Sequence, residues 1–176
     1  RNCFPSKLRK MTSSSVICEP PFGGIAFLPA IADFSSGTCT AGPSDTRDHC
    51  RDRATQVLTN ILRARDSYQQ IGIISADGHE LLHVSARGGH SSAATARQPR
   101  DLRDSTVYMA AVDLPKGQTW VSEPRAERRD EQSGSGPRNL IDSVTPLYAT
   151  DGNLSEFVYI EAYLHAFGSA MATTAG

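Results

Sequence analysis

The chain has 176 residues, of which 39% are hydrophobic, which suffices for one compact domain and is too little for two of ordinary size. Its 18 basic and 19 acidic residues give a formal net charge of −1, so neither sign of charge dominates. We therefore expect no dedicated surface for nucleic acid or for an anionic membrane.

The first 43 residues carry few structural signals. Residues 1–21 are polar, contain three prolines and show no sustained periodicity, so we expect a tail or linker there. The apolar stretch at residues 22–34 is interrupted by Pro29 and Asp33 and is too short to span a bilayer. We expect a short helix after Pro29, and we predict no signal peptide at the basic start of the chain.

Four cysteines fall in the first third of the chain, namely Cys3, Cys18, Cys39 and Cys50. Their spacing is not the CxxC of a zinc or redox site, and four cysteines allow three pairings. In an oxidising compartment Cys39 and Cys50 could form a disulfide that closes the loop before the first long helix. Unpaired thiols in a reduced protein are an equal alternative.

A helix is predicted after the Pro43-Ser44-Asp45 segment, where serine or aspartate can cap the first turn. Apolar residues recur there at the spacing of one helical face: Ala54, Val57, Leu58, Ile61 and Leu62. The pattern predicts an amphipathic helix that runs almost directly into a strand at Tyr68.

Residues 68–85 form two strand-like runs around Asp77-Gly78, a pair that favours a hairpin turn. The first run contains Ile71, Ile73 and Ile74, which predicts a strand buried on both faces. A second turn of this kind is predicted at residues 150–153.

The middle of the chain alternates loops with short elements. Residues 86–104 are nearly free of apolar side chains and predict a long exposed loop, followed by a short helix that ends near Val112. A strand is predicted at residues 118–123. Residues 124–138 predict a mobile loop, whose arginines alternate with acidic residues and should therefore be solvated.

Two more strands are predicted near the end of the chain. Residues 140–148 contain Pro146, which implies an edge position, a bulge or a strand end. Residues 156–166 alternate between two faces, and residues 168–176 look frayed. The elements together predict an α+β fold of the PAS type, a five-stranded antiparallel sheet flanked by an N-terminal amphipathic helix and a short helix.

Three segments, in this order, resemble Cache sensor domains: LTNILRARDSYQQIGIISADGHELLHVS, LRDSTVYMAAVDLPKGQTWVSEP and LIDSVTPLYATDGNLSEFVYIEAYL. Cache domains are PAS-like ligand-binding modules that lie outside the membrane in bacterial chemoreceptors, histidine kinases and diguanylate cyclases. The resemblance implies a sensor domain at residues 44–167, an N-terminal tail with a weak helical segment at 1–43, and a C-terminal tail at 168–176.

The resemblance also implies a function. We expect a non-enzymatic, periplasmic sensor that binds a small polar metabolite, needs no cofactor and signals to an effector domain outside this chain, with a homodimer as an option. Nucleic acid is not an expected partner.

By the same resemblance the ligand lies between the sheet and the short helix, and the candidate binding residues are Tyr108, Trp120, Ser122, Asp142 and Glu161. Core packing is an equal alternative for the two aromatic residues. Asp142 and Glu161 stand where the family often has an arginine and a small polar residue. Their negative charge favours a cationic or hydroxylated ligand over a carboxylate.

Three alternatives to a sensor domain are compatible with parts of the sequence. A cytosolic PAS- or GAF-like dimerisation module without a ligand is the main alternative. A small hydrolase would need a clustered Ser-His-Asp triad, and the sequence contains no GxSxG motif. His79 and His83 could join Glu80 or His90 on a metal, but surface histidines in a hairpin are commoner, so we predict no metal site.

Overall fold

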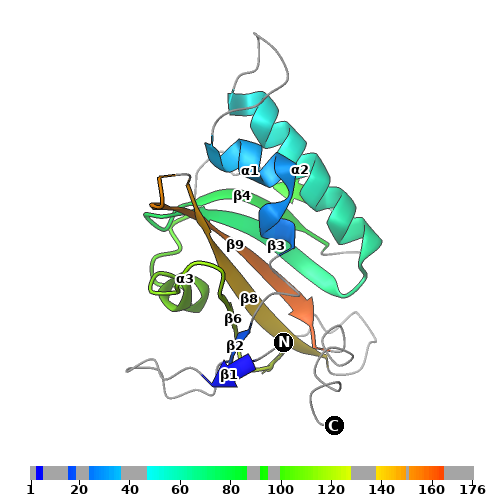
Figure 1. Ribbon diagram of the computed structural model, residues 1–176. Helices are drawn as coiled ribbons and strands as arrows, with labels where there is room; N and C mark the ends of the chain where they lie inside the picture. Colours follow the sequence, from blue (N-terminus) through cyan, green and yellow to red (C-terminus); the bar gives the residue numbers. More distant parts are fainter. Residues whose placement is uncertain are drawn as a thin grey trace.

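The computed structural model describes residues 3–5, 16–18, 24–36, 47–86, 92–94, 100–127, 138–149 and 151–164. Their strands form one nine-stranded antiparallel sheet with helices on both faces (Figure 1). This arrangement confirms the predicted α+β class. The predicted limits of the sensor domain, residues 44–167, stay a prediction.

The helical elements are the 3₁₀ turn η1 (Ile25–Phe27) and the helices α1 (Pro29–Ser36), α2 (Arg47–Ala64) and α3 (Thr106–Ala111). The strands are β1 (Cys3–Pro5), β2 (Val16–Cys18), β3 (Tyr68–Ser75), β4 (Glu80–Ser85), β5 (Ser92–Ala94), β6 (Thr119–Val121), β7 (Arg125–Ala126), β8 (Asn139–Tyr148) and β9 (Leu154–Tyr163). All the helices and strands that the sequence predicts are present, with small differences at their ends.

The five predicted strands occupy the middle of the sheet in the order β6-β8-β9-β3-β4. The last strand of the chain, β9, therefore pairs with both β8 and β3 and lies at the centre of the molecule. This order joins the hairpin β3–β4 to the later strands through β9, so contacts distant in sequence define the core.

Four short strands were not predicted. The expected tail at residues 1–21 contains β1 and β2, and β2 pairs with β6 at one edge of the sheet. The loops expected at residues 86–104 and 124–138 contain β5, which pairs with β4, and β7, which pairs with β8. Two or three residues are too few to show a periodicity, and these strands form because a neighbouring strand offers unpaired backbone groups.

One face of the sheet packs against α1 and α2. Its core includes the predicted helical residues Ala54, Leu58 and Leu62, and the sheet residues Ile71 and Ile73. The remaining two residues of the predicted helical stripe, Val57 and Ile61, are partly buried, and Ile61 packs against this core. Burial of this apolar face stabilises α2, which is the reason that the 3.6-residue pattern predicts the helix correctly.

The opposite face packs against α3. Its core joins Ile74, Trp120, Phe157 and Tyr159 to the helix residue Ala111. Because successive strand residues point to opposite faces, Ile73 packs in the core beneath α1 and α2, and Ile74 packs in the core beneath α3. The prediction that β3 is buried on both faces is thus confirmed.

The two predicted turns reverse the chain with glycines at positive φ, Gly78 at +89° and Gly152 at +84°. The register of β3 and β4 shifts between Ile73 and Ile74, so Ile73 pairs with Leu82 and Ile74 pairs with Glu80. This bulge turns the Glu80 side chain onto the α3 face, although its alternation with Leu82 would place it on the other face.

Pro146 lies inside β8, where its Cα partner on β9 is Phe157. On the other side of β8, the pairing with β6 reaches only Ser143 and Val144. Pro146 therefore occupies a local edge, which is one of the three positions that the sequence left open, and no ladder hydrogen bond is lost through its missing N–H.

Gly72 allows the Tyr159 ring to cross β3. A Cβ at position 72 would overlap ring atoms of Tyr159, whereas a Cβ at Gly24 would have no neighbour within 4 Å. We expect Gly72→Ala to lower the free energy of unfolding by about 2 kcal/mol through this overlap. Gly24→Ala, at a residue with ordinary φ, is the matched control and should change little. Equal unfolding midpoints in urea for the two variants would contradict the close contact.

Candidate functional site

The α3 face of the sheet brings together most of the predicted binding residues. Trp120 on β6 belongs to the core of this face, and its Cα partner on β8 is Val144. Asp142 lies two residues before Val144 and Glu161 two residues after Tyr159, so strand alternation turns both carboxylates toward the same face. Asp142 and Glu161 are also directly opposite each other in the β8–β9 ladder.

The two carboxylates share one arginine. Arg125 of β7 donates to Asp142 with Nη2···Oδ1 at 3.0 Å and Nε···Oδ2 at 3.2 Å, and its Nη2 also bonds to Glu161. The carboxylate side chains are only 14% and 9% exposed. Burial lowers the pKa of Arg125, but the bonds to the two carboxylates outweigh burial and raise it above its ordinary value. Arg125 is solvent-exposed as predicted, with 45% of its side chain accessible, but it lies in the short strand β7 and pairs with two carboxylates, which the sequence did not predict.

Ser122 holds the start of this cluster in place. Its backbone N–H donates to the carbonyl of Asp142, and its Oγ accepts a bond of 2.9 Å from the Asp142 N–H. The hydroxyl itself donates to the carbonyl of Glu123. These bonds continue the β6–β8 pairing past Val121, so Ser122 positions Asp142; its predicted contact with a ligand stays a prediction.

Trp120 has a buried polar atom without a partner. The side chain is 2% exposed, and its Nε1–H finds no hydrogen-bond acceptor among the described residues. A buried donor in this state costs free energy, and natural structures contain few of them. The indole N–H is therefore available on the α3 side of the sheet for an acceptor that the described residues do not provide.

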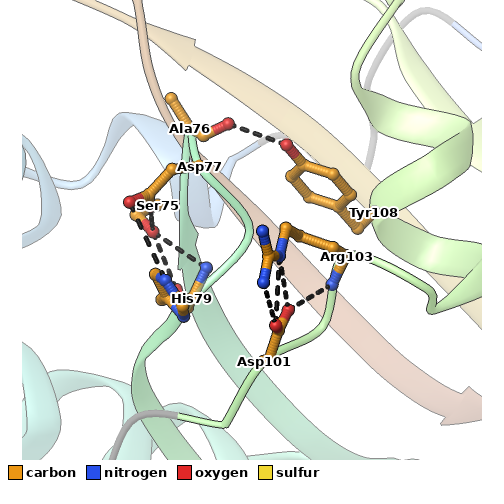
Figure 2. A network of polar contacts seen from close by, with 7 residues as sticks. All are labelled: Ser75, Ala76, Asp77, His79, Asp101, Arg103 and Tyr108. Carbon is orange, nitrogen blue, oxygen red and sulfur yellow. Dashed lines mark hydrogen bonds and ion pairs between the residues drawn. The ribbon is translucent and has the colours of Figure 1, made fainter.

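Tyr108 is used to dock α3. Its hydroxyl donates to the carbonyl of Ala76 at 2.9 Å (Figure 2), and its ring packs edge-on against Phe157 with centroids 5.6 Å apart. Ser105 caps α3 by accepting from the Tyr108 N–H. These contacts tie the helix to the β3–β4 turn, and binding of a ligand by Tyr108 stays a prediction.

A second charged network lies on this face, at Glu80. The Glu80 side chain is 2% exposed and accepts three bonds of 2.7 Å: two from Arg100, through Nε and Nη2, and one from the Tyr159 hydroxyl. Burial raises the pKa of Glu80, yet the bonds from Arg100 and Tyr159 outweigh burial and set the pKa below its ordinary value of 4.5. Burial, and then the charge of Glu80, raise the pKa of Tyr159 far above its ordinary value.

One feature of the sequence indicates this network. Every second residue of β4 is buried, namely Glu80, Leu82 and Val84, so a glutamate occupies a position where the strand pattern predicts an apolar residue. A carboxylate in such a position needs a partner. The partners, Arg100 and Tyr159, are 20 and 79 residues away in the chain, and only the fold identifies them.

The β3–β4 turn gathers a serine, a histidine and an aspartate, but not as a catalytic triad (Figure 2). Ser75 Oγ bonds to Asp77 and to the backbone of His79, which are contacts of the turn itself. The imidazole Nε2 lies 3.9 Å from Asp77 Oδ2 and 42% of the side chain is exposed. Because the hydroxyl serves the turn, this cluster does not support a hydrolase.

The histidines also do not form a metal site within the described residues, where no group of three suitable ligands occurs. His83 Nε2 lies 3.1 Å from Gln70 Oε1, and the Glu80 carboxylate is occupied by Arg100 and Tyr159. His90, the remaining histidine of that alternative, lies outside the described residues.

Cys50 is buried at the start of α2 and is disulfide-bonded. This excludes the free-thiol alternative for Cys50. Cys39, the partner that the sequence suggests, lies outside the described residues, so the Cys39–Cys50 pairing stays a prediction.

None of the helices in the described residues is both long and apolar enough to cross a membrane. The sequence matches no protein-family model and no curated protein. Similarity is found at the level of structure, among solved structures.

Two solved structures show this similarity. One is a domain of a protein assigned to the sensory box/GGDEF family from Vibrio parahaemolyticus, with a TM-score of 0.61 at 10% identity over 80% of this chain and 49% of that chain. The other is the extracellular domain of a protein described as the histidine kinase vpHK1S-Z8, with a TM-score of 0.61 at 12% identity over 83% of this chain and 49% of that chain. The present chain thus spans about half the length of either structure.

At these identities the comparison establishes the fold. Both similar structures share this fold, and the five strands predicted from the sequence lie next to one another in the sheet of this chain. The chain has the α+β fold of the PAS-like sensor domains, in agreement with its resemblance to the Cache family.

Proposed function

We propose that this chain is a ligand-binding sensory domain of a bacterial signal-transduction receptor, and that it binds a small polar metabolite on the α3 face of the sheet. The fold shared with sensor domains of receptor proteins supports the sensory role. The ligand, the extracytoplasmic location and the effector domain outside this chain are parts of the proposal.

The observation that carries the binding site is the buried, unpartnered Nε1–H of Trp120. Leaving a buried donor without an acceptor costs roughly 1–3 kcal/mol, and a ligand that supplies the acceptor would recover this cost. The ligand should therefore carry an accepting oxygen or nitrogen atom. Aromatic walls with a few fixed polar groups are the usual composition of small-molecule sites, and Tyr108, Phe157 and Tyr159 lie in or against the same core.

The charge of the neighbouring cluster narrows the ligand class. Arg125 is paired with two carboxylates, Asp142 and Glu161, so the cluster keeps one excess negative charge. A ligand carboxylate would be repelled there, whereas a hydroxyl or ammonium group can donate to the remaining lone pairs of the carboxylates. The pattern favours a hydroxylated or cationic metabolite that also offers an acceptor to Trp120.

Signalling would follow from the way in which α3 is attached. The segment before α3 bonds to the β3–β4 turn through Leu102 N–H to the Gly78 carbonyl, and α3 itself bonds to the turn through Tyr108. A ligand held between α3 and the sheet would bias the position of this unit if it binds two arrangements with different affinities. The effector domain would respond to that bias.

The test is a thermal-shift screen of small polar metabolites on the wild-type chain and on Trp120→Phe. A specific ligand should raise the melting temperature of the wild type. The phenylalanine keeps an aromatic ring and removes only the N–H and part of the ring system, so the affinity should fall roughly tenfold, the effect of about one hydrogen bond.

Trp120→Phe itself should cost little stability from hydrogen bonding, because the N–H that it removes has no partner within the described part of the protein. A metabolite that raises the melting temperature of both proteins equally would contradict the placement of the site at Trp120. The absence of any stabilising metabolite, together with a concentration-dependent dimer mass, would favour the dimerisation module instead.

A further inference from the structure

The N-terminal hairpin places two cysteines directly opposite each other. β1 and β2 are antiparallel, and Cys3 is the Cα partner of Cys18 in their register. Opposed residues of an antiparallel pair have Cα atoms about 4.5–5.5 Å apart. A disulfide requires about 4.4–6.8 Å between Cα atoms, so the backbone of this hairpin meets that requirement without rearrangement.

The bonding state of Cys50 is consistent with a bond between Cys3 and Cys18. Cys50 is already disulfide-bonded, which makes three cysteines its candidate partners. If Cys3 and Cys18 are joined to each other, Cys39 is the only partner left for Cys50. The hairpin register and the pairing suggested by the sequence therefore give one consistent set of two disulfides.

We propose that Cys3 and Cys18 form a cross-strand disulfide that closes the N-terminal hairpin, and that Cys39 is the partner of Cys50. The oxidant is the disulfide of a thiol–disulfide oxidoreductase. One thiolate attacks that disulfide and the second resolves the mixed disulfide; the two cysteines lose two electrons and two protons, and the oxidant leaves as a dithiol. This bond does not depend on the proposed sensory function.

The position of the hairpin gives the disulfide a structural consequence. β2 pairs with β6, with Ile17 opposite Trp120 and Cys18 opposite Thr119. β6 has three residues, and without β2 it would lie at the edge of the sheet. The disulfide would hold the hairpin closed beside the strand that carries Trp120, and so keep this residue buried.

Peptide mapping of the unreduced protein tests the bond. Trypsin together with a protease that cuts before aspartate separates all four cysteines, into residues 2–7, 11–32, 33–44 and 48–51. We expect the mass of 2–7 joined to 11–32, and of 33–44 joined to 48–51. A link from 2–7 to either of the last two peptides, or Cys3 and Cys18 recovered as alkylated thiols after expression in an oxidising compartment, would overturn the proposal.

Hydrogen exchange tests the consequence. In Cys3→Ser/Cys18→Ser the amides of β6 should exchange with solvent at least roughly tenfold faster. A disulfide that closes a loop of about 15 residues stabilises the folded state by more than the free energy of a tenfold change in local opening. The matched control, Cys39→Ser/Cys50→Ser, should leave β6 less affected than β3 and α2. Equal β6 exchange in the wild type and in Cys3→Ser/Cys18→Ser would refute the role of the disulfide at Trp120.

Discussion

Replacing Glu80 by alanine should lower the free energy of unfolding by about 3 kcal/mol, measured by urea denaturation. The substitution leaves the buried Tyr159 hydroxyl without its acceptor and removes the partner of Arg100. This loss of stability is near the lower limit for breaking a buried ion pair. The reason is that 57% of the Arg100 side chain is exposed, so water can hydrate the guanidinium. Residues 100–105 should keep their backbone bonds to β4 and its turn, through the Arg100 carbonyl and the Leu102 N–H, and lose only the side-chain attachment.

The matched control is Asp101→Ala, which breaks the neighbouring ion pair with Arg103. Both of those side chains are largely exposed, at 47% and 61%, so we expect no measurable change. If Glu80→Ala and Asp101→Ala unfold at the same urea concentration, the Glu80 network does not stabilise the fold.

The same residue predicts an acid dependence. The pKa of Glu80 is lower in the folded protein than its ordinary value of 4.5, so below about pH 4.5 the unfolded chain binds a proton that the folded chain does not. The stabilisation by Glu80 is present above that pH and is lost as the pH falls through the folded pKa. Glu80→Gln should be less stable than the wild type at neutral pH, and the difference should shrink in acid.

Replacing Arg125 by methionine should lower the free energy of unfolding by about 2 kcal/mol. Without the guanidinium, Asp142 and Glu161 remain as two little-exposed carboxylates on directly opposite positions of β8 and β9. Like charges in such a pair repel, and their burial is no longer compensated. Methionine retains much of the aliphatic length of arginine, so the change reports mainly on the lost charge.

A second substitution separates charge from packing. Arg125→Met/Glu161→Gln should recover about half of the loss, because one of the two carboxylates is then neutral. Arg103→Met, which breaks an exposed pair, is the control and should be neutral. A double variant that is as unstable as Arg125→Met alone would show that repulsion between the carboxylates is not the cause.

The main helix and the first hairpin could be predicted from local sequence patterns, because the folded core buries the same residues that form those patterns. The apolar spacing from Ala54 to Leu62 and the Asp77-Gly78 pair specify a helix and a hairpin from neighbours in sequence, and the core buries the same residues. Trp120, Asp142 and Glu161 lie on the α3 face, and their contact with a ligand stays a prediction.

The partners within the two charged networks could not be predicted, for a physical reason. Arg125 reaches Asp142 and Glu161 only because the two-residue strand β7 pairs with β8, and two residues have no periodicity. Glu80 reaches the α3 face through a bulge, which shifts the face of a side chain without a sequence signature. Both networks join segments that are far apart in the chain, so local sequence patterns do not show which residues are partners.

Binding of a ligand at Trp120 can be measured directly, because Trp120 is the single tryptophan of the chain. Its indole N–H gives one identifiable cross-peak in a ¹⁵N–¹H correlation spectrum. On titration with a metabolite that stabilises the protein, this peak should shift and its exchange with water should slow, as expected when the free N–H gains an acceptor. A bound metabolite that leaves the indole peak unchanged and shifts resonances of α1 and α2 instead would contradict the proposed site.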